Sequence, residues 1–375
     1  MIYNARNSSY HVNKKQLKEI VSISTGNRPS KDIEYGQYPY VNGGTSPSDY
    51  FSDYNSEPDA ITTPTHGEGG IGFVAFQKSR FWCGALCLRM YALSDDVNIK
   101  FIFYYLSNSK EEILSKKNYG GMPYINKIEF SRIQIPLPHI KVQEEIVKIL
   151  DSFTNLIDAL NEELSLREKQ FEYYREKLLT FDDKSVYTTL GKVGEFTRGN
   201  GLQKKDFTEY GFPCIHYGQI HTSYNTSASS TISYCSKSLA KKLKKAKYGD
   251  LLIATTSEDV DACCKAIAWL GEGEVAYSGD SYCFSHNENP KYMAYLFQCN
   301  MFYNQKKKSA IGAKVIRVSG DSMSQFVLPI PSLSIQQSIV EKLDAFESLI
   351  SSLKEEIALR QKQYEYYREK LLTFE

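Results

Sequence analysis

One long segment of this chain occurs twice, and this duplication constrains the fold more than any other feature. Residues 135–181 align without a gap with residues 328–374, at a shift of 193 positions. From Pro136 to Phe181, 27 of 46 positions are identical. A repeat of this kind indicates two copies of one structural unit. We therefore expect a chain built from two related halves.

Each copy of the repeat predicts one long helix. Both copies open with Pro-x-Pro, which is incompatible with a regular helix interior, and then continue for about 40 residues without Gly or Pro. Apolar side chains such as Leu150, Phe153 and Ile157 recur in steps of three and four, which is the heptad pattern of a coiled coil. A helix of this length measures about 60 Å and could hold two other parts apart.

Charged residues interrupt the apolar seam at matched positions. Arg167 and Arg360 are equivalent in the two copies, and a charge at a seam position often fixes the register of a helix pair. We expect the two copies to pack on each other, antiparallel if an approximate two-fold axis relates them. The alternative is two ordinary amphipathic helices of a bundle core, which the near identity of the copies and the domain-sized segment between them disfavour.

The segments outside the helices also resemble each other. The stretch LKEIVSISTGNRPSK from Leu17 aligns with LGKVGEFTRGNGLQK from Leu190, and Gly26-Asn27 matches Gly199-Asn200. Short apolar runs separated by Gly, Asn and Ser predict strands and turns. We expect an α/β (α+β) fold with largely antiparallel sheets, divided into a first domain at 1–141, a helix at 142–181, a second domain at 182–334 and a helix at 335–375.

Three further segments predict helices within the domains. These are residues 99–109, the lysine-rich stretch 236–247, and residues 292–304. The lysine-rich stretch can be a solvated helix face, which is the commoner case, or a surface that follows a phosphate backbone.

Composition limits the class of protein. The chain of 375 residues is long enough for two domains, contains no run of 18 apolar residues, and has a polar N-terminus without the apolar core of a signal peptide, so we expect a cytoplasmic protein. The eight cysteines show no repeated CxxC pair and predict buried free thiols. A zinc site of Cys214, His216 and His221 lacks a fourth ligand at suitable spacing, and we expect no metal site.

The net charge of +1 conceals an uneven distribution. Acidic residues are concentrated in the two long helices, so the rest of the chain is mildly basic. This distribution is compatible with binding to phosphates.

The sequence contains no convincing catalytic motif. Residues 66–72 include a literal GxGxxG, but a strand-like run follows them where a dinucleotide fingerprint requires a helix, so they predict a glycine-rich hairpin. There is no Walker phosphate loop, no Asn-Pro-Pro-Tyr type of tetrapeptide, no nuclease carboxylate cluster and no triad. We expect a non-catalytic chain without catalytic residues.

Polar side chains in glycine-rich turns are the best candidates for contacts with DNA, because loops on a rigid scaffold can reach the edges of bases and the cations among them can reach phosphates. In the first domain the candidates are Asn27, Arg28, Lys31, Asn42, Thr45, His66, Glu68 and Arg80. In the second domain they are Arg198, Asn200, Lys204, Lys205, His216, Gln219, Thr255, Thr256, Glu258 and Lys314. Each of them, taken singly, is more often structural than functional.

The arrangement resembles the DNA-specificity subunit of type I restriction–modification systems. The resemblance covers nearly the whole chain, with two variable domains that each open with a strand and a Gly-Asn turn, and two helices that open with Ile-Pro-Leu-Pro or Leu-Pro-Ile-Pro. The stretches KKLKKAKYGDLLIATTSEDV and EVAYSGDSYCF also look like parts of target recognition domains in that family.

The resemblance implies a division of labour. Each domain would read one half of an asymmetric, bipartite site in double-stranded DNA, and the coiled coil would set the gap between the halves. Two methyltransferase subunits would bind the chain and bring S-adenosylmethionine. Two restriction subunits, which act as motor and nuclease, would bring ATP and Mg²⁺, leaving no cofactor on this chain. The alternative is a two-headed scaffold that binds polypeptides or glycans at its globular ends.

Overall fold

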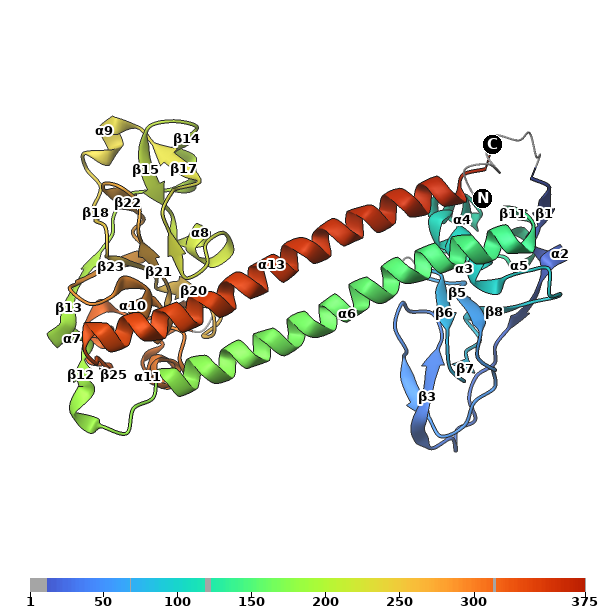
Figure 1. Ribbon diagram of the computed structural model, residues 1–375, viewed down its shortest axis with the longest axis horizontal. Helices are drawn as coiled ribbons and strands as arrows, with labels where there is room; N and C mark the ends of the chain where they lie inside the picture. Colours follow the sequence, from blue (N-terminus) through green and yellow to red (C-terminus); the bar gives the residue numbers. More distant parts are fainter. Residues whose placement is uncertain (1–11, 68, 119–122, 313–314, 375) are drawn as a thin grey trace. The chain divides into compact units, whose positions relative to one another are not determined.

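The computed structural model of the chain describes residues 12–67, 69–118, 123–312 and 315–374 (Figure 1). It divides into two compact units, which we call unit 1 (Met1–Glu162 and Glu355–Glu375) and unit 2 (Glu163–Lys354). Each unit contains one globular domain and one part of each long helix.

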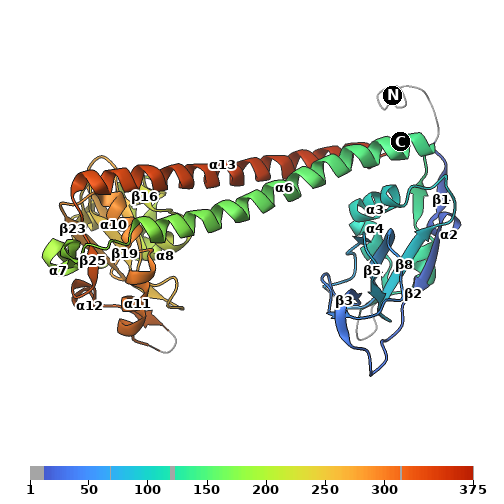
Figure 2. The ribbon, with the colours of Figure 1, turned by 60° about the horizontal axis from the view of Figure 1, so that its bottom comes forward.

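Unit 1 contains a four-stranded antiparallel sheet with the strand order β2-β8-β5-β6. The four strands are β2 (Val21–Thr25), β8 (Cys87–Ala92), β5 (Ala60–Pro64) and β6 (Ala75–Gln77). A second sheet has the order β4-β3-β7, formed by β4 (Asp49–Phe51), β3 (Tyr35–Val41) and β7 (Trp82–Cys83). The side chains of β5 are all buried, because both faces of the strand are covered. On one face Ile61 packs in a cluster with Phe101 and Ile102 of α3 (Ile99–Asn108), which contacts β5 and β6 (Figure 2). The neighbouring Ala60 packs in a separate cluster with Phe81 and Cys83.

Short elements complete unit 1. They are β1 (Lys14–Gln16), α2 (Leu17–Ile20), α4 (Lys110–Ser115), β9 (Lys117–Asn118), β10 (Tyr124–Ile125), α5 (Lys127–Ser131) and β11 (Gln134–Pro136). The pairing of β1 with β11 brings the described beginning of the chain next to the entry of the first long helix.

Unit 2 repeats this plan with additional strands. Its main sheet has the order β13-β23-β19-β21-β16, formed by β13 (Gly194–Arg198), β23 (Ser281–His286), β19 (Leu251–Ala254), β21 (Lys265–Trp269) and β16 (Ser227–Ala228). The first four of these strands correspond in order and direction to those of unit 1. The second sheet has the order β14-β17-β15-β22-β18, formed by β14 (Phe207–Thr208), β17 (Ser233–Cys235), β15 (Phe212–Ile215), β22 (Val275–Tyr277) and β18 (Lys245–Ala246).

The remaining short elements of unit 2 lie around these sheets. They are η1 (Lys184–Val186), β12 (Tyr187–Thr189), α7 (Leu190–Val193), η2 (Lys204–Asp206), α8 (Tyr217–Thr222), α9 (Lys237–Ala240), β20 (Thr256–Ser257), α10 (Pro290–Leu296), α11 (Asn300–Ser309), β24 (Ile316–Arg317), α12 (Gly320–Ser324) and β25 (Val327–Pro329). The α/β class and the duplication are therefore confirmed, and most strand pairs are antiparallel.

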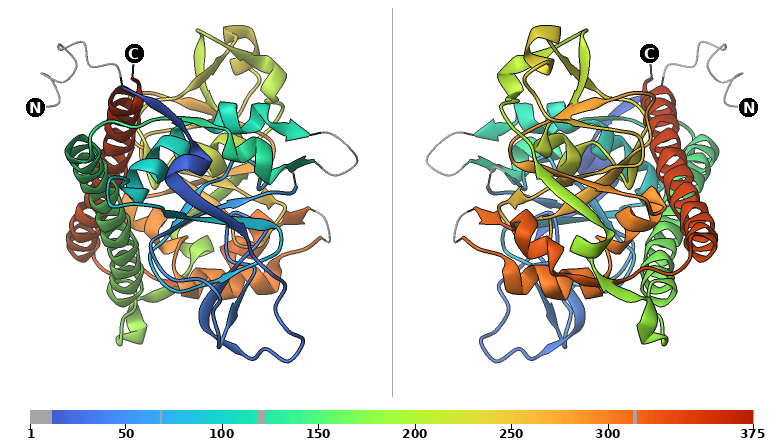
Figure 3. Two further views of the ribbon diagram at one scale, coloured as in Figure 1. Left: turned by 90° about the vertical axis from the view of Figure 1, so that its right-hand side faces the viewer. Right: turned by 90° about the vertical axis from the view of Figure 1, so that its left-hand side faces the viewer.

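The two long helices are α6 (Ile140–Leu178) and α13 (Leu333–Leu372). In unit 1 the ring of Phe153, near the start of α6, stacks on Tyr367 near the end of α13. In unit 2 the relation is reversed, since Tyr174 near the end of α6 stacks on Phe346 near the start of α13. The helices therefore pack on each other, as the seam predicted, and they run antiparallel, as expected if an approximate two-fold axis relates the copies. Figure 3 shows the start of α6 beside the end of α13 at unit 1.

The matched arginines act within their own helices. Arg167 contacts Glu163 at 3.2 Å and Gln170 at 3.0 Å, and Arg360 makes the equivalent contacts with Glu356 and Gln363 at 3.2 and 3.0 Å. The partners lie three and four residues away, on the same face of the helix. The equivalence of the arginines therefore reflects the repeat, while aromatic side chains make the described ring contacts between the helices.

A buried glutamine attaches each long helix to its domain. In unit 1, the Oε1 atom of Gln143 accepts a hydrogen bond from the Asn98 N–H at 2.9 Å, and its Nε2 donates to the carbonyls of Asp96 and Pro138 at 3.0 and 2.8 Å. The side chain of Asn98 in turn caps α3. Gln143 is 0% exposed, so its amide group satisfies backbone atoms that would otherwise be buried without partners.

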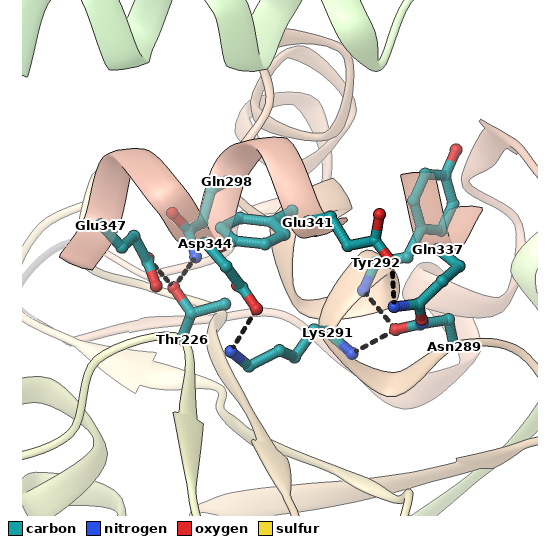
Figure 4. A network of polar contacts seen from close by, with 10 residues as sticks. Thr226, Asn289, Lys291, Tyr292, Gln298, Gln337, Glu341, Asp344 and Glu347 are labelled. Carbon is teal, nitrogen blue, oxygen red and sulfur yellow. Dashed lines mark hydrogen bonds and ion pairs between the residues drawn. The ribbon is translucent and has the colours of Figure 1, made fainter. Parts of the chain in front are cut away.

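Unit 2 uses the equivalent residues. Gln336, also 0% exposed, accepts from the Asn289 N–H at 2.9 Å and donates to the Pro331 carbonyl at 2.8 Å. About two turns further along α13, Asp344 accepts from Lys291 Nζ at 2.8 Å (Figure 4). It also accepts from the Tyr295 hydroxyl at 2.8 Å. In unit 1, Asp151 accepts from Lys100 and Tyr104 in the same way, at 2.6 and 2.7 Å.

Two helix predictions within the domains were wrong. The lysine-rich stretch 236–247 forms only the short helix α9, and the chain then turns into strand β18, because Leu243 is buried and Lys245–Ala246 pair with β22. The helix predicted at 292–304 is divided into α10 and α11, because Cys299 has an extended backbone (φ −81°, ψ 157°). The helix at 99–109 is confirmed as α3.

Other predictions from composition can be compared directly with the fold. All eight cysteines are buried and free, as expected. Within the described ranges, no three His, Cys, Asp or Glu side chains are grouped so that they could hold a metal ion. None of the helices that the structure describes is long and apolar enough to cross a membrane.

Candidate nucleic-acid interface

The Gly-Asn turn of each domain packs against one loop of the same domain. In unit 1 this is the β7–β8 loop (residues 84–86), and in unit 2 it is the β22–β23 loop (residues 278–280). A Cβ atom on Gly26 would collide with the Cys83 carbonyl, and one on Gly199 would collide with the Ser278 carbonyl. Both glycines are therefore required by the close approach of two backbone segments, which explains their place in the repeat.

Two predicted residues of unit 1 hold the β7–β8 loop in place. The Asn27 N–H donates to the Cys83 carbonyl at 3.1 Å, and the Asn27 side chain accepts from Asn55 at 2.6 Å. Asn42 accepts from the Leu86 N–H at 2.9 Å. These asparagines position the loop, and Arg28, Lys31 and Thr45 are exposed on neighbouring segments.

His66 lies on the other side of the same loop. Its ring stacks on Tyr124 with centroids 6.0 Å apart, and its Nδ1 lies 2.8 Å from Thr65 Oγ1. Thr65 donates from its N–H and its hydroxyl to the Leu86 carbonyl, at 2.8 and 3.0 Å. The structure therefore brings Asn27, Asn42 and His66 together around one loop. Glu68 lies outside the described residues.

Arg80 lies beside the second sheet of unit 1. It forms an ion pair with Glu57 at 3.0 Å, and its guanidinium group lies 4.5 Å from the ring centroid of Tyr54. Both charged side chains are about half exposed, so water screens the pair and the cation stays accessible to solvent.

Sequence reasoning missed Arg89, which organises the interior of this site. Its Nη1 donates to the Asn55 carbonyl at 2.5 Å and to Ser56 Oγ at 2.7 Å, and its Nε donates to Ser24 Oγ at 3.0 Å. Asn55 in turn contacts both the N–H and the carbonyl of Cys83. A single arginine within the otherwise apolar run CLRMYA is the signal that could have identified it.

In unit 2 the basic residues gather at the β22–β23 loop. Arg198 Nε donates to the Gly279 carbonyl at 3.1 Å. Asn200 donates to the Lys242 carbonyl at 2.9 Å and accepts from the Lys244 N–H at 2.8 Å, which places the lysine-rich segment beside the Gly-Asn turn. Lys242 and Lys244 are exposed, as are Lys204 and Lys205 on η2.

His216 and Gln219 stabilise the start of α8. His216 Nδ1 accepts from the Gly218 N–H at 3.2 Å, while Gln219 accepts from the His216 N–H at 2.9 Å and donates to Ser233 at 2.6 Å. Burial lowers the pKa of His216, and the positive charge of Lys204 lowers it further. His216 is only 7% exposed, and its hydrogen bonds are those of a residue that caps a helix. Contact of either residue with DNA stays a prediction.

Thr255 and Thr256 contact the last residue of the β22–β23 loop. Thr255 donates from its N–H and its hydroxyl to the Asp280 carbonyl, at 3.2 and 3.4 Å. Thr256 Oγ1 lies 3.4 Å from Asp280 Oδ1. Both threonines are buried, and Glu258 is exposed shortly beyond them. Lys314 lies outside the described residues.

The two sites are equivalent in backbone and different in side chains. Thr65 and Thr255 make the same two hydrogen bonds, to Leu86 in unit 1 and to Asp280 in unit 2. The next residues, His66 and Thr256, form β-bridges with Tyr124 and Arg317, respectively. Each site presents polar and aromatic or basic groups on a fixed backbone, an arrangement suited to recognition of a polyanion.

The long helices also carry exposed apolar residues at matched positions. Leu156, Leu166 and Tyr173 of α6 are 39%, 60% and 60% exposed. Their counterparts 193 residues later are Leu349, Leu359 and Tyr366, which are 39%, 61% and 58% exposed. We call these six residues the exposed apolar set. Each exposed residue of α6 therefore has a counterpart of nearly equal exposure in α13.

Comparison with known proteins agrees with this organisation. A family model of the type I restriction modification DNA specificity domain matches residues 11–166 and, a second time, residues 183–359. Together the two matches cover well over half of the chain.

Curated relatives extend over the same length. A putative type I restriction enzyme specificity subunit of Haemophilus influenzae is 29% identical over 96% of this chain and 95% of its own length. A type I restriction enzyme specificity subunit of Escherichia coli is 29% identical over 76% of this chain and 74% of its own length. In fold, the chain is similar to the crystal structure of a type I restriction-modification S subunit from M. genitalium, with a TM-score of 0.64, 17% identity and 98% coverage of both chains.

Proposed function

This chain belongs to the type I restriction modification DNA specificity family, and we propose that it is the sequence-reading subunit of such a complex, in which each domain reads one half of a bipartite, asymmetric DNA site. The observation that carries the proposal is the pair of equivalent sites. Each domain fixes a Gly-Asn turn against one loop, and the side chains at the two loops differ. One scaffold with two sets of side chains suits two different half-sites.

Phosphate contacts would come from the exposed cations beside these loops. In unit 2 these are Lys204, Lys205, Lys242 and Lys244, and in unit 1 Arg28 and Lys31 are exposed near the Gly-Asn turn. Such contacts provide affinity and position the domain on the duplex, whereas contacts to base edges provide specificity. The asparagines and threonines that hold the loops would keep the base-reading groups in fixed positions.

The helix pair would set the length of the gap between the half-sites. Both α6 and α13 run from one unit into the other without a break, and each contains about 40 residues. A helix of this length measures about 60 Å, which is long compared with the ~34 Å of one DNA turn. The buried Gln143 and Gln336 attach the domains firmly to this spacer.

Two methyltransferase subunits would dock on the exposed apolar set. The support for this proposal is that these exposed leucines and tyrosines occur at matched positions in both helices. Because each residue has a counterpart of nearly equal exposure in the other copy, the surface fits two identical partners. Two restriction subunits would join this core.

The chemistry would then reside on the partners. S-adenosylmethionine would bind to the methyltransferase subunits, and ATP and Mg²⁺ to the restriction subunits, while this chain would act as a non-catalytic recognition subunit. The asparagines and His216 of the candidate site agree with this assignment, because they hold loops or cap a helix.

Binding of duplex DNA by the complex of this chain with its methyltransferase subunit tests the proposal. We expect co-purification of the two proteins and tight binding that weakens steeply as salt rises, since each phosphate contact releases counterions. Failure to co-purify, with a polypeptide or glycan bound instead at the globular domains, would favour a two-headed scaffold.

A further inference from the structure

The last residue of the loop differs most in chemistry between the two equivalent sites. Leu86 ends the β7–β8 loop and is 39% exposed, whereas Asp280 ends the β22–β23 loop and is partly exposed. The backbone of each is fixed by the two hydrogen bonds from Thr65 or Thr255. The same place on the scaffold therefore presents an isobutyl group in unit 1 and a carboxylate in unit 2.

Segments that contain basic residues border the loop that carries Asp280. Arg198 donates a hydrogen bond to the carbonyl of the neighbouring Gly279. Gly279 also lies close to Asn200, since a Cβ on Gly279 would be 3.6 Å from the Cα of Asn200. Asn200 binds the backbone of the lysine-rich segment on its other side. The loop that carries the carboxylate is therefore bordered by segments that expose cations.

A carboxylate at such a place has few favourable uses against DNA. Phosphates repel it, and most groups on the base edges of the grooves are hydrogen-bond acceptors. The favourable partners in the major groove are exocyclic amino groups, N4 of cytosine or N6 of adenine. A leucine at the same place would instead favour an apolar partner such as the methyl group of thymine.

The internal contacts of Asp280 leave its side chain available for such a role. The contact between Oδ1 and Thr256 Oγ1 is long, at 3.4 Å, and the two hydrogen bonds from Thr255 go to the backbone carbonyl. The fold of the loop therefore depends mainly on the backbone of this residue.

We propose that Asp280 is a specificity-determining residue that accepts a hydrogen bond from an exocyclic amino group of a base in the half-site read by unit 2. Leu86 marks the equivalent position for the half-site of unit 1. This inference rests on the proposed function and adds to it the chemistry of one base position in each half-site.

The test is methylation mapping by long-read sequencing in a methylation-free host that expresses the full chain with its methyltransferase subunit. Wild type is mapped first, which tests the proposed function by itself. The variant Asp280→Asn keeps a similar shape and an acceptor for Thr256 but loses the charge. Asp280→Leu places the side chain of the other site at this position, and Leu86→Asp makes the reciprocal change.

We expect wild type to prefer a base with an exocyclic amino group at one position of one half-site. Both Asp280 variants should weaken this preference, so that discrimination between the amino-bearing base and the other bases at that position falls about tenfold. The other half-site and the gap stay unchanged. Leu86→Asp changes one position in the opposite half-site. The control Glu272→Gln removes an exposed carboxylate elsewhere in the same domain and leaves the motif unaltered.

Two results would overturn the inference while leaving the proposed function intact. In the first, wild type methylates a defined motif and both Asp280 variants methylate the same motif with every base preference unchanged. The other is an equal loss of methylation at all sites by Asp280→Asn, with the complex still assembled, since that result would mark a structural carboxylate.

Discussion

The ring of Phe153 stacks on the ring of Tyr367, with centroids 5.4 Å apart and 24° between the planes. The residues 193 positions from these two, Phe346 and Tyr174, stack at the same 5.4 Å with 20° between the planes. One contact thus occurs twice with the roles of α6 and α13 exchanged. This is the arrangement that an approximate two-fold relation between the repeats requires.

A heptad inserted into both helices should lengthen the gap of the DNA site. Insertion after Glu162 and after Lys354, where the two units meet in the sequence, preserves the seam and both aromatic stacks. Seven residues add about 10 Å, or about three base pairs. Methylation mapping of the double insertion reports the gap directly. An active variant whose gap is unchanged would contradict a spacer function for the helices.

Replacement of the buried glutamine should loosen one domain from its helix. Gln143→Leu removes three hydrogen bonds and leaves the Asn98 N–H and two carbonyls without their partner. We expect a loss of about 2–4 kcal/mol in the free energy of unfolding of unit 1, and faster hydrogen exchange at the start of α3. Gln336→Leu should have the same effect on α10. The surface variant Gln361→Leu serves as control. The expectation fails if Gln143→Leu lowers the free energy of unfolding no more than Gln361→Leu does.

The stability of unit 2 should decrease in mild acid through His286. Burial lowers the pKa of His286 from its ordinary value of 6.5, against smaller opposing effects of Asp250 and Glu288. The unfolded chain therefore binds a proton more readily than the folded chain. The destabilisation is absent above about pH 6.5 and grows as the pH falls below that value.

Denaturant unfolding at a series of pH values measures this effect. The variant His286→Gln should lose part of the decline between neutral and mildly acidic pH, whereas His139→Gln, at an exposed position, should retain it. Equal pH profiles for wild type and His286→Gln would show that His286 does not contribute.

Charges in the exposed apolar set should remove the methyltransferase subunits one at a time. Leu166→Asp should reduce the co-purified methyltransferase from two copies to one, and the double variant with Leu359→Asp should retain neither. Because these leucines are 60% and 61% exposed, the stability of the chain should change by less than about 0.5 kcal/mol. Native mass spectrometry measures the stoichiometry. The control is Ser351→Asp, which introduces the residue that α6 already carries at the equivalent Asp158.

Exchange of the second domain should alter one half of the DNA site. Replacement of residues 182–334 by the corresponding segment of a relative leaves unit 1, α6 and all but the first two residues of α13 in place. We expect a methylated motif with a new half-site on one side and the original half-site on the other. A motif in which both halves change would show that the domains do not read independently.

The sequence was sufficient for the long helices because their stability is encoded locally. Heptads, Pro-x-Pro entries and the near identity of the two copies all lie within one segment, and the structure confirms the helices and their antiparallel pairing. The lysine-rich stretch misled because its helix propensity is local, whereas the pairing of Lys245–Ala246 with β22 depends on a strand about 30 residues away in the chain.

The candidate site could be predicted only in part for the same reason. Gly26 and Gly199 were recognisable as turn residues, but the sequence does not reveal which loop they approach. The positions of Leu86 and Asp280, each fixed by a threonine from another strand, become apparent only once the sheets are assembled. Arg89 was missed because its partners Ser24 and Asn55 are far away in the sequence.

The most direct test of the account is methylation mapping by long-read sequencing in a methylation-free host that expresses the cognate methyltransferase subunit with or without this chain. The account predicts a split, asymmetric methylated motif that is present with the chain and absent without it. Contradiction would come from a folded, chain-bound methyltransferase subunit that produces no chain-dependent methylation.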